Sequence, residues 1–263
     1  MANFRIPGPI SGINSSFWFD YTVLAQWLSP VRGPVSVVPV PRQHFAGPDV
    51  SFIFRQCLNP ALGLTEADYT EAATALGSEV AAIKAVAEVE TSGKAFDESG
   101  RPRILFERHY FHRLTGGRFS AGHPDISNRR PGGYGSFLSQ YVKLERAYEL
   151  DHDAALRSAS WGRFQIMGDN YLAAGFNSIR EFVLAMTRSE SEHLRAFTKF
   201  VASNNKMLAA LRRNDWAAFA ALYNGPGYKK NHYDTKMKDA YNRCKGVSPA
   251  GKDAPAPIKT RLP

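Results

Sequence analysis

The chain has 263 residues, of which 44% are hydrophobic and 22% are charged. This composition excludes an intrinsically disordered chain, and the length allows a sizeable core that needs neither metals nor disulfides. The formal net charge of +9 favours polyanionic partners: nucleic acid, anionic membrane surfaces or bacterial envelopes. Charge alone does not choose among these three.

Signals for export and for oxidative folding are sparse. Cys57 and Cys244 are far apart, so free thiols in a reducing compartment are the simpler interpretation, with a single disulfide as the alternative. The first residues lack the pattern of a secretory signal, and the apolar stretch 17–40 is broken by charges and prolines. We therefore expect a protein made in the cytoplasm without a signal peptide.

Residues 1–63 form a distinct zone that contains an aromatic segment followed by a proline-rich stretch. Prolines at this density argue against continuous helix and for an irregular, extended structure. We interpret this zone as an N-terminal extension packed on the main domain, with a small targeting module as the alternative.

Helical patterns begin at Thr65, which together with the acidic residues that follow it is typical of a helix N-cap. Gly77 is expected to stop this helix. Ser78 is expected to cap a second helix from Glu79 to about Thr91, and its apolar residues cover nearly the whole circumference, which predicts burial.

The rest of the chain is also expected to be mainly helical. Residues 92–135 are rich in turn signals and hold one predicted helix around 105–114. Further helices are predicted over 136–150, 179–185, 190–203, 205–213 and 216–223. Alternation typical of strands is scarce, and the basic, proline-rich residues 246–263 are expected to form a flexible tail. The predicted fold class is mainly α.

Glu90 stands near the end of the second predicted helix. Burial and the negative end of the helix dipole both disfavour its ionised form, so its pKa should be raised. A glutamic acid that stays protonated near neutral pH can protonate a glycosidic oxygen. On helix geometry alone, a solvated glutamate at a fraying helix end is the alternative.

Two later motifs offer polar side chains at chain turns. The segment Ala159-Ser160-Trp-Gly-Arg-Phe-Gln165-Ile-Met167 is expected to form a turn that leads into a helix and presents one amide side chain. In the segment 222–228, a Gly-Pro-Gly run should stop a helix and leave Tyr223 and Asn224 at its exposed end, where they suit sugar recognition. Each motif alone could also be an ordinary helix start or stop.

Taken in chain order, these motifs resemble the goose-type lysozyme and soluble lytic transglycosylase superfamily. Over about residues 64–243 the chain also resembles the phage N-acetylmuramidase endolysin family, through the segments 85–90, 101–112, 160–168 and 223–228. The resemblance implies a lysozyme-like helical catalytic domain over 64–245. It also implies that the acid is Glu90 and that substrate is bound by Gln165, Met167, Tyr223, Asn224 and Tyr228.

The chain departs from those families in two segments that lie outside the motifs. The gap between Glu90 and Gln165 is much longer than in short transglycosylases, which marks residues 92–158 as an insertion. Residues 1–63 do not match the peptidoglycan-binding repeat that is often fused to endolysins of this family.

Glycoside hydrolysis usually employs a second carboxylate beside the acid. Glu107 is our first candidate for a second catalytic residue, and Asp97 and Asp125 are weaker ones. An ion pair with Arg103 or Arg108 is the alternative for Glu107. Without such a partner the enzyme would be a lytic transglycosylase.

A metal site is not expected. His109 and His112 are spaced to share one helix face, but they lack a convincing third ligand. No cofactor is expected either.

The predicted function is that of an endolysin that hydrolyses the β-1,4 bond between N-acetylmuramic acid and N-acetylglucosamine in bacterial peptidoglycan. The alternatives are a lytic transglycosylase that leaves 1,6-anhydromuramic ends and a non-catalytic basic protein that binds cell wall or nucleic acid. Against nucleic acid, the basic residues are dispersed and match no known motif. We expect a monomer that binds peptidoglycan and anionic envelope polymers after release through a separate membrane pore.

Overall fold

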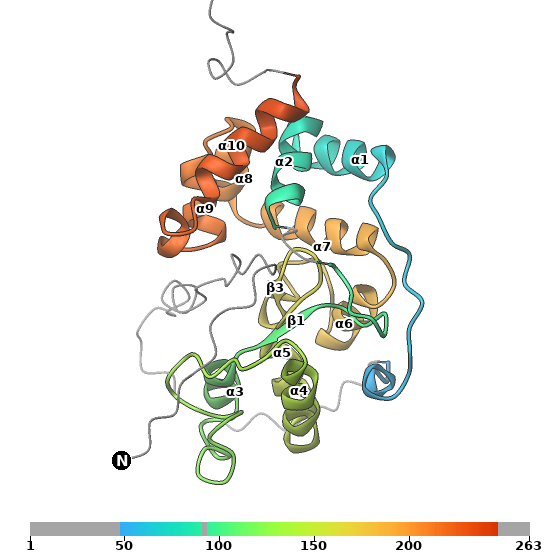
Figure 1. The fold of residues 1–263 in the computed structure, drawn as a ribbon, viewed down its shortest axis with the longest axis vertical. Coiled ribbons are helices and arrows are strands. Elements are labelled where there is room, and N and C mark those ends of the chain that lie inside the picture. Colours follow the sequence, from blue (N-terminus) through green and yellow to red (C-terminus); the bar gives the residue numbers. More distant parts are fainter. Residues whose placement is uncertain (1–47, 91–93, 247–263) are drawn as a thin grey trace, which may run out of the picture.

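The computed structural model describes residues 48–90 and 94–246, and every structural statement below refers to these residues (Figure 1). They form ten α-helices, three short strands and three short 3-10 helices. The predicted mainly α fold class is confirmed. The expectations for residues 1–47 and for the tail after Gly246 lie outside the described residues.

The first helical hairpin begins largely as predicted. Helix α1 (Glu66–Leu76) starts in a capping box in which the Thr65 side chain accepts from the Asp68 N–H and Asp68 accepts from the Thr65 N–H. Gly77, with φ 58°, ends the helix in the left-handed conformation that glycine adopts without strain. Helix α2 (Val80–Glu90) follows, and eight of its residues are buried, as its apolar circumference predicts.

The predicted cap of α2 is wrong. The Glu79 carbonyl accepts the first helical N–H groups, from Ala82 and Ile83, so Glu79 takes the cap position. The Ser78 hydroxyl is buried and has no hydrogen-bond partner among the described residues.

The predicted helix around 105–114 begins later than expected. Residues Ile104–Phe106 form strand β1, and helix α3 (Arg108–Leu114) starts only after it. Strand β1 pairs antiparallel with β2 (Ala159–Trp161), which places Ile104 opposite Trp161. Apolar side chains such as Ile104 and Phe106 fit a buried strand as readily as a helix, and the distant partner strand decides between the two.

The segment after Trp161 turns back into a third strand instead of a helix. Strand β3 (Ile166–Met167) pairs antiparallel with β2, so the sheet order is β1-β2-β3. The prediction of a turn that leads into a helix is therefore wrong, because the turn is the tip of a hairpin.

Seven further helices complete the described part of the fold. They are α4 (Ser139–Leu150), α5 (His152–Arg157), α6 (Ile179–Met186), α7 (Glu190–Ala202), α8 (Asn205–Arg212), α9 (Trp216–Tyr223) and α10 (Tyr233–Cys244). Helices α6 to α9 lie within one residue of their predicted bounds, and α5 and α10 were not predicted. In Figure 1, α1, α2, α8, α9 and α10 gather at one end of the molecule, and α3, α4 and α5 lie at the other end beyond the sheet.

The described part of the N-terminal extension, residues 48–63, packs on the helical domain. Val50 and Ile53 are fully buried in the common core, beside a short 3-10 helix (Ser51–Phe54). The Leu58 N–H donates to the Ser99 carbonyl, and Ala61 forms an isolated bridge with Ser189. These contacts agree with a packed arm, and the division of the chain at residue 64 stays a prediction.

The structure also describes the two cysteines and the length and polarity of the helices. Cys57 and Cys244 are exposed and unpaired. Across the ranges described, none of the helices has the length and apolar character needed to cross a membrane.

Candidate active site

Glu90 is the last residue of α2 and lies in the interior, where it is 4% exposed. Burial raises the pKa of its carboxyl to about 7. A hydrogen bond from Asn224 Nδ2 to Glu90 Oε1, 3.0 Å long, acts in the opposite direction and lowers that pKa. The expected rise in pKa is therefore present, and the carboxyl is mostly protonated in mildly acidic solution.

Asn224 caps the C-terminus of α9 and reaches across to α2 from a position 134 residues along the chain. It is 9% exposed, so the prediction of an exposed helix end is wrong at this position. Its amide nitrogen holds Glu90, whereas its Oδ1 is buried without a hydrogen-bond partner among the described residues. A buried acceptor without a donor is energetically costly, and a ligand that donates to it would recover that cost.

Tyr223 is also buried, which corrects its predicted exposure. Its hydroxyl donates to the Phe164 carbonyl at 2.7 Å, and its ring stacks on Phe219 at a centroid distance of 5.7 Å. Burial raises the pKa of this hydroxyl well above its usual value, and the neighbouring Glu90 charge raises it further. Tyr223 therefore ties the β2–β3 turn to α9, directly beside Asn224.

Tyr233, at the start of α10, was missed by the sequence analysis. It is 3% exposed, and its pKa is raised first by burial and then by the charge of Glu90, so it lies close to the acid. No motif marked it, because the polar sequence of α10 gave little sign of a buried helix.

Gln165 lies at the base of the hairpin turn and does not point freely into a cleft. Its Nε2 donates to the carbonyls of Gly162 at 2.8 Å and Arg103 at 3.2 Å, and its Oε1 accepts from the Ser160 hydroxyl. These bonds hold its backbone in a left-handed conformation with φ 48°. The predicted contact of Gln165 with substrate stays a prediction, and the observed contacts hold the turn.

His193, on α7, holds the same turn through a hydrogen bond. Its Nδ1 accepts the Arg163 N–H at 3.0 Å, so its Nε2 carries the hydrogen and donates to the Met186 carbonyl at 2.7 Å. Burial lowers the pKa of His193 to about 4, which keeps the ring neutral, and the two hydrogen bonds fix its tautomer. Sequence analysis gave no signal for this role.

The other two predicted substrate-binding residues lie on neighbouring elements. Met167 follows the turn in β3 and is 6% exposed, and Tyr228 is half-buried in the 3-10 helix Pro226–Lys229. Their contact with substrate stays a prediction.

The three candidates for a second carboxylate differ in how they are paired. Asp97 bonds the Arg101 side chain and backbone, and Asp125 bonds Arg146. Glu107 is 2% exposed and forms no ion pair with Arg103 or Arg108, which was the alternative considered for it. Its ionisable neighbour is His109, whose Nδ1 lies 3.0 Å from Glu107 Oε2 without the alignment of a hydrogen bond.

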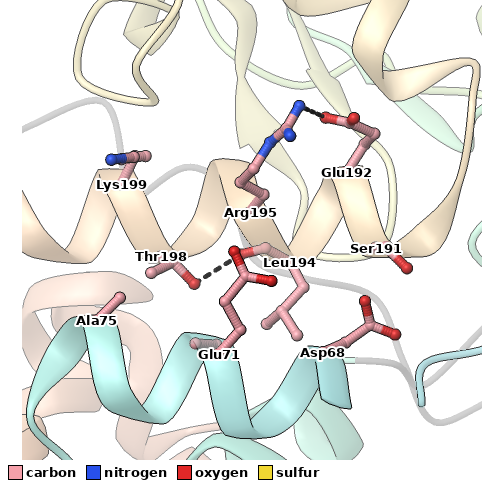
Figure 2. Close-up of a pocket in the computed structure, with 10 residues that line it drawn as sticks. Asp68, Glu71, Ala75, Ser191, Glu192, Leu194, Arg195, Thr198 and Lys199 are labelled. Atoms are coloured by element: carbon pink, nitrogen blue, oxygen red, sulfur yellow. Dashed lines mark hydrogen bonds and ion pairs between the residues drawn. The ribbon is translucent and has the colours of Figure 1, made fainter.

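Two further features of the described residues lie apart from Glu90. No cluster of three or more potential metal ligands occurs among the described residues, and His112 Nδ1 bonds the Ser120 hydroxyl. A groove of about 290 Å³ lies between α1 and α7, and Figure 2 shows the side chains that line it. Charged residues of both signs line it, and they are Asp68, Glu71, Glu192, Arg195 and Lys199. None of the predicted site residues lines this groove.

A mainly helical lysozyme-like domain with a buried glutamate of raised pKa at a helix end defines the class of the protein. A family model described as N-acetylmuramidase matches residues 79–245, more than half of the chain. The chain therefore belongs to the N-acetylmuramidase family, whose members degrade peptidoglycan.

The chain is also similar to a solved structure described as the crystal structure of Burkholderia AP3 phage endolysin. The two are 43% identical, the match covers 70% of this chain and 72% of that chain, and the TM-score is 0.67. No curated protein matches the chain. The predicted resemblance to the phage N-acetylmuramidase endolysin family is thereby confirmed.

Proposed function

We propose that the chain hydrolyses the β-1,4 bond between N-acetylmuramic acid and N-acetylglucosamine, with Glu90 as the general acid. The observation that carries this proposal is the environment of Glu90: a buried carboxyl with a pKa near 7, held by one amide and without an ion pair among the described residues. Such a group keeps a proton that it can give to a leaving oxygen.

The hydrogen bond from Asn224 orients this acid. Because Asn224 Nδ2 donates to Glu90 Oε1, the carboxyl proton is carried by Oε2. Oε2 donates this proton to the glycosidic oxygen as the C1–O bond of the muramyl residue breaks. The N-acetylglucosamine hydroxyl then leaves as a neutral group, and water adds to C1.

Asn224 also supplies a recognition group for the saccharide. Its unpartnered Oδ1 accepts an N–H or O–H from the bound sugar, for which the acetamido N–H is the natural donor. Met167 and Tyr228 line the adjoining sugar-binding surface, and Gln165 and Tyr223 hold the turn that shapes it.

Asn224→Leu is expected to change the pH dependence of the enzyme. Loss of the amide raises the pKa of Glu90, because the Asn224 bond lowers it, so the alkaline limb of kcat/KM moves to higher pH. Loss of a hydrogen bond of this kind moves the alkaline limb by about one pH unit or less. Loss of the Oδ1 acceptor should also lower kcat/KM by about tenfold or more. Initial rates on soluble peptidoglycan fragments between pH 4 and 9 measure both effects. An alkaline limb at the wild-type pH would contradict the assigned role of the amide.

The main alternative is a lytic transglycosylase, in which the muramyl C6 hydroxyl attacks C1 in place of water. This route needs no second carboxylate, and the side-chain hydrogen bond observed at Glu90 among the described residues is the one from Asn224.

Mass spectrometry of the fragments released from purified peptidoglycan distinguishes the two. Reducing muramic ends from the wild type, and none from Glu90→Gln, are expected from the proposed hydrolase. Anhydromuramic ends would establish the transglycosylase, and an absence of fragments from the wild-type protein would contradict both.

A further inference from the structure

The groove between α1 and α7 has no part in the chemistry proposed for Glu90 (Figure 2). Its volume of about 290 Å³ is close to the lower limit of roughly 300 Å³ for small-ligand sites. Small, apolar or hydroxyl side chains supply its uncharged lining, and these are Ala72, Ala75, Ser191, Leu194 and Thr198. The alanines on the α1 side leave room between the two helices for a ligand.

The charges of this groove differ between its two ends. In Figure 2 the carboxylates of Asp68 and Glu71 lie toward one end, and Lys199 lies at the other. Burial raises the pKa of Asp68, but hydrogen bonds from Thr65 and Ser191 outweigh it and lower that pKa, so the carboxyl is ionised at neutral pH. An acidic end on a protein of net charge +9 excludes a polyanion as the ligand of this groove.

Glu71 and Lys199 are the lining charges that stay available to a ligand. Arg195 pairs with Glu192, and Asp68 accepts from the Thr65 hydroxyl. Neither the Glu71 carboxylate nor the Lys199 ammonium has an ion pair or hydrogen bond with the described residues. The groove therefore offers one carboxylate from α1 and one ammonium from α7.

These charges define the class of ligand that the groove fits. From Asp68 to Ala75 the groove follows seven residues of helix, a length of about 10 Å at ~1.5 Å per residue. An extended peptide covers this length with about three residues. The complementary ligand is thus a short peptide with a free amine toward one end and a free carboxylate toward the other.

Helix α7 lies between this groove and the wall of the Glu90 site. Thr198 lines the groove, whereas the preceding residue, Phe197, packs edge-on against Tyr223. Tyr223 adjoins Asn224, which holds Glu90. Because a helix with its side chains is about 10–12 Å across, roughly this distance separates the groove from that wall.

We propose that the groove binds the stem peptide of peptidoglycan, with the free amine of its diamino acid at Glu71 and its terminal carboxylate at Lys199. This inference rests on the proposed muramidase function, because the muramyl residue carries the stem peptide on its lactyl group. Four extended residues reach about 14 Å, which suffices to pass one helix. The peptide is bound equally before and during bond cleavage, so the groove lowers KM and leaves kcat unchanged.

The first test is calorimetric titration of the full chain with the free stem tetrapeptide, which needs no catalysis. A Kd of about 1 mM is expected, as two ion pairs in a shallow groove allow. Glu71→Gln and Lys199→Gln should each weaken binding about fivefold, and both variants should fold because both side chains are exposed. Glu88→Gln and Lys206→Gln are the matched controls, because these exposed residues do not line the groove, and they should bind as the wild type does.

Acetylation of the side-chain amine of the same tetrapeptide identifies the contact with Glu71. The acetylated peptide should bind the wild type about fivefold more weakly, and should bind Glu71→Gln no more weakly than the free amine does, because the paired charge is already absent. No binding of the tetrapeptide to the wild type at ten times the expected Kd would overturn the inference. Wild-type affinity in both groove variants would overturn it too.

The second test compares glycan strands that carry stem peptides with strands from which an amidase has removed them. The double variant Glu71→Gln/Lys199→Gln is expected to raise KM about tenfold or more on the first substrate, with kcat unchanged, and to cleave the second as the wild type does. Equal changes on both substrates would contradict a peptide site. If the wild type cleaves neither substrate, the proposed function fails while the titration still decides the inference. If it cleaves both but binds no peptide, the inference alone fails.

Discussion

Glu90→Gln is expected to lower kcat by about a thousandfold while the chain stays folded. Glutamine fills the same volume and can still accept from Asn224, but it has no proton to give to the glycosidic oxygen. Glu88→Gln is the matched control, because Glu88 lies on the same helix, is 52% exposed at its side chain and pairs with Arg243. Initial rates on soluble peptidoglycan fragments give kcat for all three proteins. A Glu90→Gln enzyme that kept a tenth of the wild-type rate would remove Glu90 from its role.

The same substitution is expected to stabilise the protein at neutral and alkaline pH. The pKa of Glu90 is raised from 4.5 to about 7 in the native state, so the unfolded chain loses this proton at lower pH than the folded chain does. The free energy of unfolding therefore falls as the pH rises from 4.5 to 7, by about 3 kcal/mol once Glu90 is ionised in both states. Urea unfolding at pH 5 and pH 8 should show this loss in the wild type and not in Glu90→Gln. Equal losses in the two proteins would indicate an ordinary carboxyl.

Gly162→Ala is expected to be the most destabilising of the conservative changes around the site. Gly162 has φ 69°, and an added Cβ would lie 2.8 Å from ring atoms of the buried His193. The left-handed backbone costs an alanine about 1–2 kcal/mol, and the collision adds about 1–3 kcal/mol because His193 is held at both nitrogens. Loss of the turn should also lower activity, since the turn anchors Tyr223 beside Asn224.

Gly116→Ala isolates the backbone contribution. Gly116 has φ 62°, and nothing lies within 4 Å of its added Cβ. Chemical unfolding of the two variants at pH 7 should therefore give a loss of about 1–2 kcal/mol for Gly116→Ala and a clearly larger one for Gly162→Ala. Equal losses would show that His193 moves aside and does not hold the turn.

Local signals predicted much of the helical framework. The capping residue Thr65, the stop at Gly77 and the periodicity of 179–212 give helix bounds close to those observed, because caps and amphipathic faces depend on nearby residues. Strand β1 was missed, because three apolar residues carry too little pattern to separate strand from helix until β2, more than fifty residues later, supplies the partner.

Sequence analysis indicated which residues form the site better than it indicated how those residues are arranged. Motif resemblance indicated Glu90 and Asn224 together, yet their hydrogen bond spans 134 residues and no local rule gives it. The Gly-Pro-Gly stop correctly ended α9 and suggested that Tyr223 would be exposed. In fact Tyr223 packs among aromatic rings of α7 and α9 and donates to the hairpin turn. Sequence patterns do not show which residues distant elements will bury. This burial is what raises the pKa of Glu90.

The most direct test of the central claim is the pKa of Glu90 itself. With ¹³C-labelled glutamate, the side-chain carboxyl resonance that disappears in Glu90→Gln identifies this residue, and its chemical shift can be followed between pH 3 and 9. We expect a midpoint near 7, as the buried carboxyl requires. A midpoint near 4.5, the ordinary value for glutamate, would mean that Glu90 is ionised at neutral pH and would contradict its assignment as the acid.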